Sequence, residues 1–189
     1  MRKPSHRPPP EFVAYIVDAI ENAPGVDSEI RQLIATLRGA GLVNAGYVNA
    51  DYRPHVSLSV HRAIDERFAV EAVAALSERH APIQVTFPYV GIFNGVPGAL
   101  FLGINAVGPL REIHDDLAGR LFDAGVACWD YYVPEHWIPH CALLVDEDRS
   151  RLVSGLSLVS QRVPLAGTLD SIGVCGFRNS HEFRLRDSA

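Results

Sequence analysis

The 189-residue sequence is poor in cysteine, with three in all: Cys128, Cys141 and Cys175. The number is odd, and no two of them stand in the Cys-x-x-Cys spacing. Disulfide frameworks are typical of small secreted domains, whereas thiols persist in reducing compartments. This use of cysteine predicts a cytoplasmic protein without a disulfide framework.

The sequence also lacks a long apolar run near its beginning. Phe12–Val17 is apolar but stops at Asp18, whereas a membrane-spanning helix needs about 20 apolar residues. The run is also too short for the apolar part of a secretory signal. Residues 1–10 contain four prolines and are expected to form a flexible arm. We therefore expect no membrane partner.

The sequence has fewer basic than acidic residues, with 17 Lys and Arg against 22 Asp and Glu, which gives a formal net charge of -5. Proteins that coat nucleic acid neutralise many phosphates with Lys and Arg, so extended nucleic-acid binding is disfavoured. A small phosphorylated ligand or a nucleic-acid end needs only a few local donors and stays open. With 48% hydrophobic residues the chain is expected to fold, since disordered chains hold far fewer.

The apolar pattern predicts helices mixed with hairpin-linked strands, an α+β architecture. Apolar residues at helical spacing predict helices at about 28–38, 65–76, 109–124 and 148–159. Short apolar, partly β-branched runs predict strands at 12–17, 54–60, 83–93, 100–107, 139–145, 163–177 and 183–185. No linker separates the two halves, so we expect one bilobed domain over residues 11–189, present as a monomer.

One short pattern occurs twice in the chain. Residues 52–60 and 137–145 both read aromatic, any residue, Pro, His, apolar, small, Leu, any residue, Val. The two histidines, His55 and His140, are 85 residues apart, close to half the chain length. Duplication of a lobe produces such a spacing. The repeat therefore predicts two equivalent strands, one in each half.

Strand geometry places a histidine on the front of each strand. Successive side chains alternate between faces, so His55 shares a face with Ser57, and His140 shares one with Ala142. The apolar residues between them would lie behind, under helices. Two such strands related by approximate two-fold symmetry bring two imidazoles into one central cleft. We expect them on the order of 5–8 Å apart, flanking a single phosphate.

Two facing imidazoles suit phosphodiester chemistry, which makes His55 and His140 the candidate catalytic residues. Histidine is the side chain whose ordinary pKa lies near neutrality. A neutral imidazole can take a proton from the attacking hydroxyl or water, while an imidazolium protonates the leaving oxygen. Ser57, on the His55 face, can donate a hydrogen bond to a phosphoryl oxygen. Such chemistry requires no metal and no cofactor.

The two copies resemble the paired His-x-Thr/Ser motifs of the 2H phosphoesterase superfamily, which includes the 2′-5′ RNA ligase-like proteins and cyclic nucleotide phosphodiesterases. Residues 54–58 match the first motif fully, and residues 139–143 match the second except at Ala142, where the family usually has Thr or Ser. Residues 91–93, with the strand that follows, also look like the family's inter-motif segment. The resemblance covers about residues 11–186. It implies antiparallel-rich sheets with flanking helices around a central cleft, and 2′,3′-cyclic phosphates of nucleotides or RNA ends as substrates.

Three further residues are candidates for substrate contacts. Arg53 could supply positive charge beside the first motif, although exposed arginines are common. Tyr132 and Trp137 precede the second motif, and aromatic rings near a phosphate can stack on a base, although core packing would also explain them. Two other histidines, His61 and His114, are expected at the surface.

Two other functions stay open beside a cyclic phosphodiesterase. Ala142 removes one hydroxyl donor, which also fits a nucleotide- or RNA-end-binding protein that turns over poorly. His136 and His140 have the His-x-x-x-His spacing that can hold zinc on a helix, but Pro139 between them argues against a helix. Chelator sensitivity separates a metal hydrolase from the other two, and turnover of a cyclic phosphate separates enzyme from binding protein.

Overall fold

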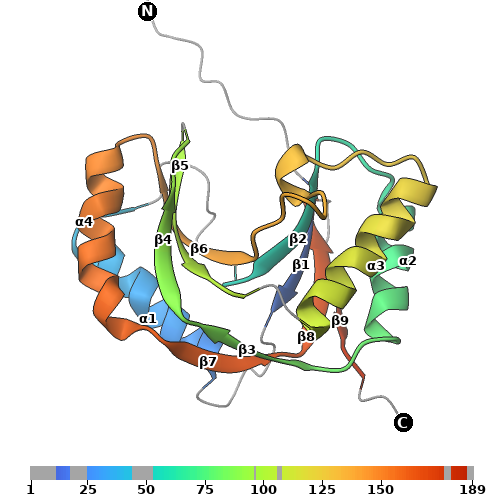
Figure 1. Ribbon diagram of the computed structural model, residues 1–189, viewed down its shortest axis with the longest axis horizontal. Coiled ribbons are helices and arrows are strands. Elements are labelled where there is room, and N and C mark those ends of the chain that lie inside the picture. The colour runs from blue at the N-terminus through green and yellow to red at the C-terminus, as the bar shows by residue number, and fades with distance from the viewer. Residues whose placement is uncertain are drawn as a thin grey trace, which may run out of the picture.

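The computed structural model describes residues 12–17, 25–43, 53–95, 97–105, 108–176 and 180–186. The predicted flexible arm, residues 1–10, lies outside them. Within the described residues, helices are interspersed with antiparallel strands, which confirms the predicted α+β class (Figure 1).

The order of elements follows the sequence prediction closely. The helices are α1 (Val26–Gly39), α2 (Glu66–Ser77), α3 (Pro109–Asp123) and α4 (Arg149–Val159), with 3-10 turns η1 (Asp130–Tyr132) and η2 (Ser160–Arg162). The strands are β1 (Phe12–Val17), β2 (Val56–His61), β3 (Ile83–Phe87), β4 (Tyr89–Phe93), β5 (Gly98–Gly103), β6 (His140–Asp146), β7 (Leu165–Leu169), β8 (Ser171–Cys175) and β9 (His181–Arg184).

Local signals in the sequence account for where three of the helices begin. Asp65 precedes α2, and its carboxylate accepts a hydrogen bond from the Phe68 amide at 2.8 Å. Asp148 precedes α4 and accepts one from the Ser150 amide, also at 2.8 Å. Such caps satisfy amide groups that have no partner within the helix. Pro109 opens α3, at a position where no amide donor is needed.

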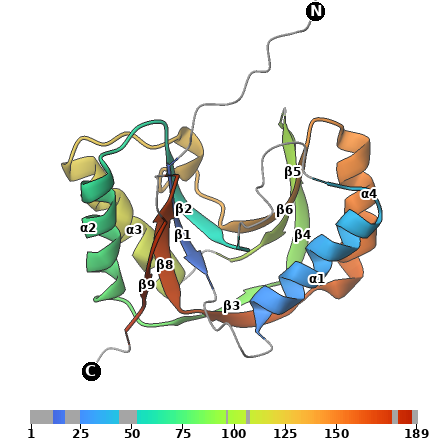
Figure 2. The same cartoon turned by 180° about the vertical axis from the view of Figure 1, so that it is seen from behind.

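The molecule has two lobes joined by a two-stranded sheet. The first lobe consists of the sheet β2-β1-β8-β9, covered by α2 and α3, and the second of the sheet β4-β5-β6, covered by α1 and α4. Figures 1 and 2 show the two helix pairs on opposite outer sides, with the β3–β7 pair connecting the lobes along one edge. Strands β2 and β6, which carry the repeated pattern, lie next to each other between the lobes.

The chain order is duplicated, as the repeat predicts. Elements β1-α1-β2-α2-β3-β4 are followed by β5-α3-β6-α4-β7-β8 in the same arrangement, with β9 added. The halves exchange elements, since β8 pairs with β1 and β4 pairs with β5. Helix α1 likewise packs against α4 and β6, and α3 against α2 and β2. Each lobe therefore contains elements of both halves.

Two predicted strands are wrong in one respect, because each is two strands. The run 83–93 divides at Pro88 into β3 and β4, and the run 163–177 divides at Asp170 into β7 and β8. In both cases the two pieces belong to different sheets. Pro88 has no amide hydrogen for a ladder. Asp170 is buried, and its side chain binds Arg184 where the chain changes sheet.

Helices and sheets enclose a core of leucine, isoleucine and valine that extends through both lobes. The fully buried Leu100, Leu102 and Leu144 lie on the back of the second lobe's sheet, while Leu58 and Ile172 belong to the first lobe. Burial of each such side chain contributes roughly 1.5–3 kcal/mol. Among the described residues, no helix combines the length and the apolar character that crossing a membrane requires.

Candidate functional site

The two repeated strands share an irregularity at the same place. In the β1–β2 pair, Ser57 and Ser59 have partners on β1, and Leu58 between them is extra. In the β5–β6 pair, Ala142 and Leu144 have partners on β5, and Leu143 is extra. Both extra residues stand three positions after the histidine. Bulges of this kind bend a strand and re-aim its side chains, so the duplication extends to backbone detail.

The predicted alternation of faces holds at both motifs. His55 and Ser57 are partly exposed, whereas Val56 between them is buried. On β6, His140 is partly exposed and Ala142 exposed. Each strand therefore shows its histidine and the residue two positions later on one face, with the apolar residue behind.

Both imidazoles are held by the same hydrogen bond. Nδ1 of His55 lies 2.9 Å from the Arg53 carbonyl oxygen, and Nδ1 of His140 lies 2.7 Å from that of Ile138. A carbonyl oxygen only accepts, so Nδ1–H is the donor in both cases. In the neutral rings Nε2 then carries the lone pair, which is the arrangement of a general base.

Burial lowers the pKa of both histidines. The pKa of His55 is lowered by desolvation and, to a smaller extent, by the charge of His140, while the bond to Arg53 opposes the shift. Desolvation also lowers the pKa of His140, against the bond to Ile138. The strand that follows His55, β2, contacts β6, which His140 opens. Near neutral pH both rings are uncharged.

Cys141 shows how the motifs meet. The His55 backbone amide hydrogen-bonds the Cys141 sulfur, so the residue after one histidine contacts the backbone of the other. Burial raises the pKa of the Cys141 thiol to about 12. A thiol in this state is not a nucleophile at neutral pH. Its place is structural, behind the paired histidines.

The surroundings of the two histidines differ, because aromatic rings flank His140. Phe93 and Phe101 meet its imidazole edge to face, with centroids 4.8 Å and 5.4 Å away, and stack on each other at 4.0 Å. Gly91 leaves space for this, since a side chain there would lie 2.5 Å from the Phe101 ring. The front of the second lobe is therefore apolar where the first lobe presents Ser57.

The predicted substrate-binding residues are all held by contacts within the protein. Arg53 forms an ion pair with Glu182 at 3.0 Å, and Tyr132 packs against the core from η1. Trp137 is 5% exposed, and its indole Nε1–H donates to the Ser57 carbonyl at 3.0 Å. A substrate contact by Arg53, Tyr132 or Trp137 stays a prediction. Sequence reasoning missed the aromatic group around His140, although the spacing of Tyr89, Gly91 and Phe93 on one strand face was visible.

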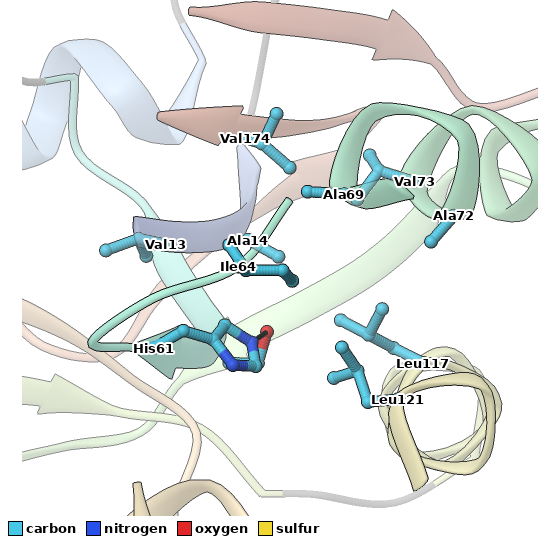
Figure 3. Close-up of a pocket in the computed structure, with 11 residues that line it drawn as sticks. Val13, Ala14, His61, Ile64, Ala69, Ala72, Val73, Leu117, Leu121 and Val174 are labelled. Carbon is cyan, nitrogen blue, oxygen red and sulfur yellow. Dashed lines mark hydrogen bonds between the residues drawn. The ribbon is translucent and has the colours of Figure 1, made fainter. Parts of the chain in front are cut away.

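The surface positions expected for His61 and His114 are wrong. Both are buried: His61 is 2% exposed and His114 is 1% exposed. His61 donates through Nδ1 to the Ala127 carbonyl at 2.9 Å and accepts through Nε2 from Ser59 Oγ at 3.0 Å. It borders a cavity of about 20 Å³ between the first lobe's sheet, α2 and α3, shown in Figure 3. Desolvation lowers the pKa of both histidines.

His136 and His140 do not share a helix. His136 lies in a turn after η1, where Nδ1 donates to the Asp130 carbonyl at 3.0 Å, whereas His140 opens β6. In the part of the chain that the structure describes, no three His, Cys, Asp or Glu side chains form a group that could hold a metal ion.

Comparisons with known proteins agree with this architecture. A family model described as the 2′-5′ RNA ligase superfamily matches residues 22–178. The fold is similar to TT0787 of Thermus thermophilus, with a TM-score of 0.63, 15% identity, and coverage of 95% of this chain and 100% of that one. It is also similar to E. coli LigT complexed with 3′-AMP, with a TM-score of 0.57, 16% identity, and coverage of 95% and 97%. No curated protein sequence matches the chain.

Proposed function

Because the chain belongs to the 2′-5′ RNA ligase superfamily, within the 2H phosphoesterases, we propose that it hydrolyses the 2′,3′-cyclic phosphate of a nucleotide or an RNA end without a metal. The observation that carries the proposal is the matched histidine pair. His55 immediately precedes β2 and His140 opens β6, both use the same Nδ1 bond to a backbone carbonyl, and the charge of His140 contributes to the lowered pKa of His55. These shared features support a common role for the two histidines.

The proposed reaction needs one proton acceptor and one proton donor. One imidazole takes a proton through Nε2 from a water molecule, whose oxygen attacks phosphorus. The bond from phosphorus to the 2′ or 3′ oxygen breaks, and the other imidazole, protonated, gives its proton to that oxygen. The Ser57 hydroxyl donates to a phosphoryl oxygen and stabilises its developing charge.

The partner follows from the same reasoning. E. coli LigT has been solved in complex with 3′-AMP, which supports a nucleotide-like ligand for this fold. We assign to this chain a small cyclic nucleotide or an RNA end, held with help from Arg53, Tyr132 and Trp137, and no extended nucleic acid. The three cysteines are free in the structure, in keeping with the cytoplasmic location that we propose. We further propose that the protein is a monomer.

A second candidate function is binding with little turnover, and Ala142 favours it. At Ala142 the second lobe offers a methyl group where a hydroxyl would hold the phosphoryl oxygen. The aromatic rings around His140 add no donor either. A protein of this kind would hold a cyclic phosphate or RNA end and release it unchanged.

Turnover of a panel of 2′,3′-cyclic nucleotides, followed by chromatography, tests the proposal. His55→Ala should lower kcat by roughly 10²–10⁴-fold, the usual contribution of a general acid or base. His136→Ala, which removes an exposed imidazole outside the pair, should leave kcat unchanged. EDTA should have no effect on either protein. Binding without product would favour the second candidate, and loss of activity in EDTA that zinc restores would contradict both.

A further inference from the structure

A strap follows the outer edge of β2, formed by residues 126–139 between α3 and β6. Strand β2 lies at the edge of the first lobe's sheet, so its outer side has no neighbouring strand within that sheet. The Trp129 amide donates to the Val60 carbonyl at 2.9 Å. The Trp137 indole Nε1–H donates to the Ser57 carbonyl at 3.0 Å. Chain from the second half thus satisfies carbonyls of the first motif strand.

The Trp137 side chain is held from two directions. Its ring stacks on the buried His114 imidazole of α3, with centroids 3.8 Å apart and planes 9° from parallel. His114 is itself fixed, because Nε2–H donates to the Tyr132 carbonyl at 3.1 Å. Because the indole ring is fixed by stacking on one face, its N–H points in a fixed direction. The bond to Ser57 is therefore directed by packing and does not depend on a flexible side chain.

The bond joins the two motifs at short range. Trp137 stands three residues before His140, and Ser57 stands two residues after His55. Pro139 lies between Trp137 and His140 and fixes φ there, so little backbone freedom separates the indole from the imidazole. A displacement of Trp137 along β2 would therefore also displace His140.

We propose that Trp137 is a positioning residue whose indole N–H, held on the Ser57 carbonyl, sets the placement of His140 relative to His55. Two groups that act on opposite sides of one phosphorus must keep their spacing, and misplacement on the order of 1 Å can cost about 100-fold in rate. The Trp137–Ser57 bond is suited to keep that spacing, because it links the segment just before His140 to the strand just after His55. The kinetic consequence rests on the proposed function, whereas the spacing itself does not.

The two tryptophans of the chain provide a matched pair of variants. Trp137→Phe keeps a ring for the stack on His114 and removes the N–H that binds Ser57. Trp129→Phe removes an indole N–H that has no hydrogen-bond partner among the described residues. On a 2′,3′-cyclic nucleotide we expect Trp137→Phe to lower kcat about tenfold with little change in KM. Trp129→Phe should have the kcat and KM of the wild type.

A second measurement requires no substrate. NMR titration of the imidazoles reports how strongly His140 affects the titration of His55. With Trp137 present, His140→Ala should raise the pKa of His55, because the charge of His140 contributes to the lowering of that pKa. In the Trp137→Phe background the same change should produce a smaller shift, since the two rings are less closely held. A purely structural Trp137 would alter stability and leave this shift intact.

The outcomes separate the possibilities. A smaller shift in Trp137→Phe, with Trp129→Phe like the wild type, supports the proposal even if no cyclic nucleotide is turned over. An unchanged shift together with unchanged kcat per folded molecule overturns it. If Trp137→Phe does not fold, both tryptophans can be replaced biosynthetically by the isosteric benzothienylalanine. That replacement keeps both ring systems and removes only the one indole hydrogen bond that the structure shows.

Discussion

At the scale of single residues, the charge state of His55 and His140 before and after binding sets the chemistry. Burial leaves both imidazoles neutral near pH 7, so a base is present in the free protein but an acid is not. A phosphate anion between the rings would favour the imidazolium form of one of them, since a nearby negative charge raises the pKa of histidine. In the proposed reaction, binding of the substrate therefore creates the acid.

The single hydroxyl on the motif faces leads to a prediction. Ser57→Ala should weaken phosphate binding or slow turnover by tenfold or more, about 1.4 kcal/mol, since hydrogen bonds to charged groups contribute roughly 1.5–3 kcal/mol. Ala142→Thr adds a donor at the equivalent exposed position of β6 and should improve binding or turnover by about tenfold. Both variants would be measured on one cyclic phosphate, with circular dichroism to establish folding. If Ser57→Ala has no effect while Ala142→Thr abolishes activity, the shared face does not hold a phosphate.

Predictability differs from residue to residue for physical reasons. The paired faces of His55 and His140 were predictable because strand alternation needs only local sequence. The burial of His61 was not, since the bulge at Leu58 shifts the alternation and turns Ser59 and His61 into the core. The spacing of Tyr89, Gly91 and Phe93 on one strand face was visible in the sequence, but its place beside His140 was not, because that depends on which strand pairs with β6.

At the scale of elements, the sheet of the second lobe depends on close approach of α4. Gly155 of α4 faces the sheet, and a side chain there would meet Leu100 at 2.9 Å and Leu37 at 3.2 Å. Leu37 belongs to α1, so Gly155 lies where two helices and the sheet converge. Helix α4 can pack this tightly because the position has no side chain.

Two glycine substitutions measure that contact. Gly119→Ala in α3 meets nothing within 4 Å, so it should stabilise the protein by about 0.5–1 kcal/mol through helix propensity. Gly155→Ala has the same gain in propensity but crowds buried leucines, and overpacking costs roughly 1–3 kcal/mol. Urea unfolding should therefore give Gly155→Ala a lower free energy of unfolding than Gly119→Ala. Equal values for the two variants would mean that α4 is free to move outward.

Helices were more predictable than strands at this scale. Caps such as Asp65 and Asp148 and the helical spacing of apolar residues are local signals. The division of 83–93 and 163–177 is not local, because each run is continuously strand-like and changes sheet only through distant partners. In the first half the break separates β3, which pairs with β7, from β4, which pairs with β5 of the second half. In the second half it separates β7 from β8, which pairs with β1 of the first half.

At the scale of the whole molecule, exchange of strands and helices makes the lobes interdependent. Since β8 completes the sheet of β1 and β4 completes the sheet of β5, neither half of the chain can form its lobe alone. The two motif strands meet where the lobes contact each other. Loss of structure in one lobe should therefore also separate the histidines.

Histidines with a lowered pKa make the stability of the whole molecule depend on pH. The pKa values of His55, His61, His114 and His140 are all lowered, mainly by desolvation. In the unfolded chain these groups titrate near their ordinary pKa of about 6.5. Between that value and the lower folded values the unfolded chain binds more protons at these four groups, so they lower the free energy of unfolding as the pH falls through this window. Each unequal proton contributes at most about 1.4 kcal/mol per pH unit.

Urea unfolding at several pH values between about 5.5 and 7.5 would measure this slope in the range where histidines titrate. His114→Phe keeps a flat ring against Trp137 and removes one buried titrating group. The free energy of unfolding of this variant should therefore depend less steeply on pH, by at most the contribution of one proton. Carboxyl groups with lowered pKa, such as Asp146 bound by the Asp148 amide and Arg151, lose their contribution only as the pH falls through their own folded pKa, which lies below about 4. A pH dependence between 7 and 5.5 that is the same in His114→Phe as in the wild type would contradict the lowered pKa of the buried His114.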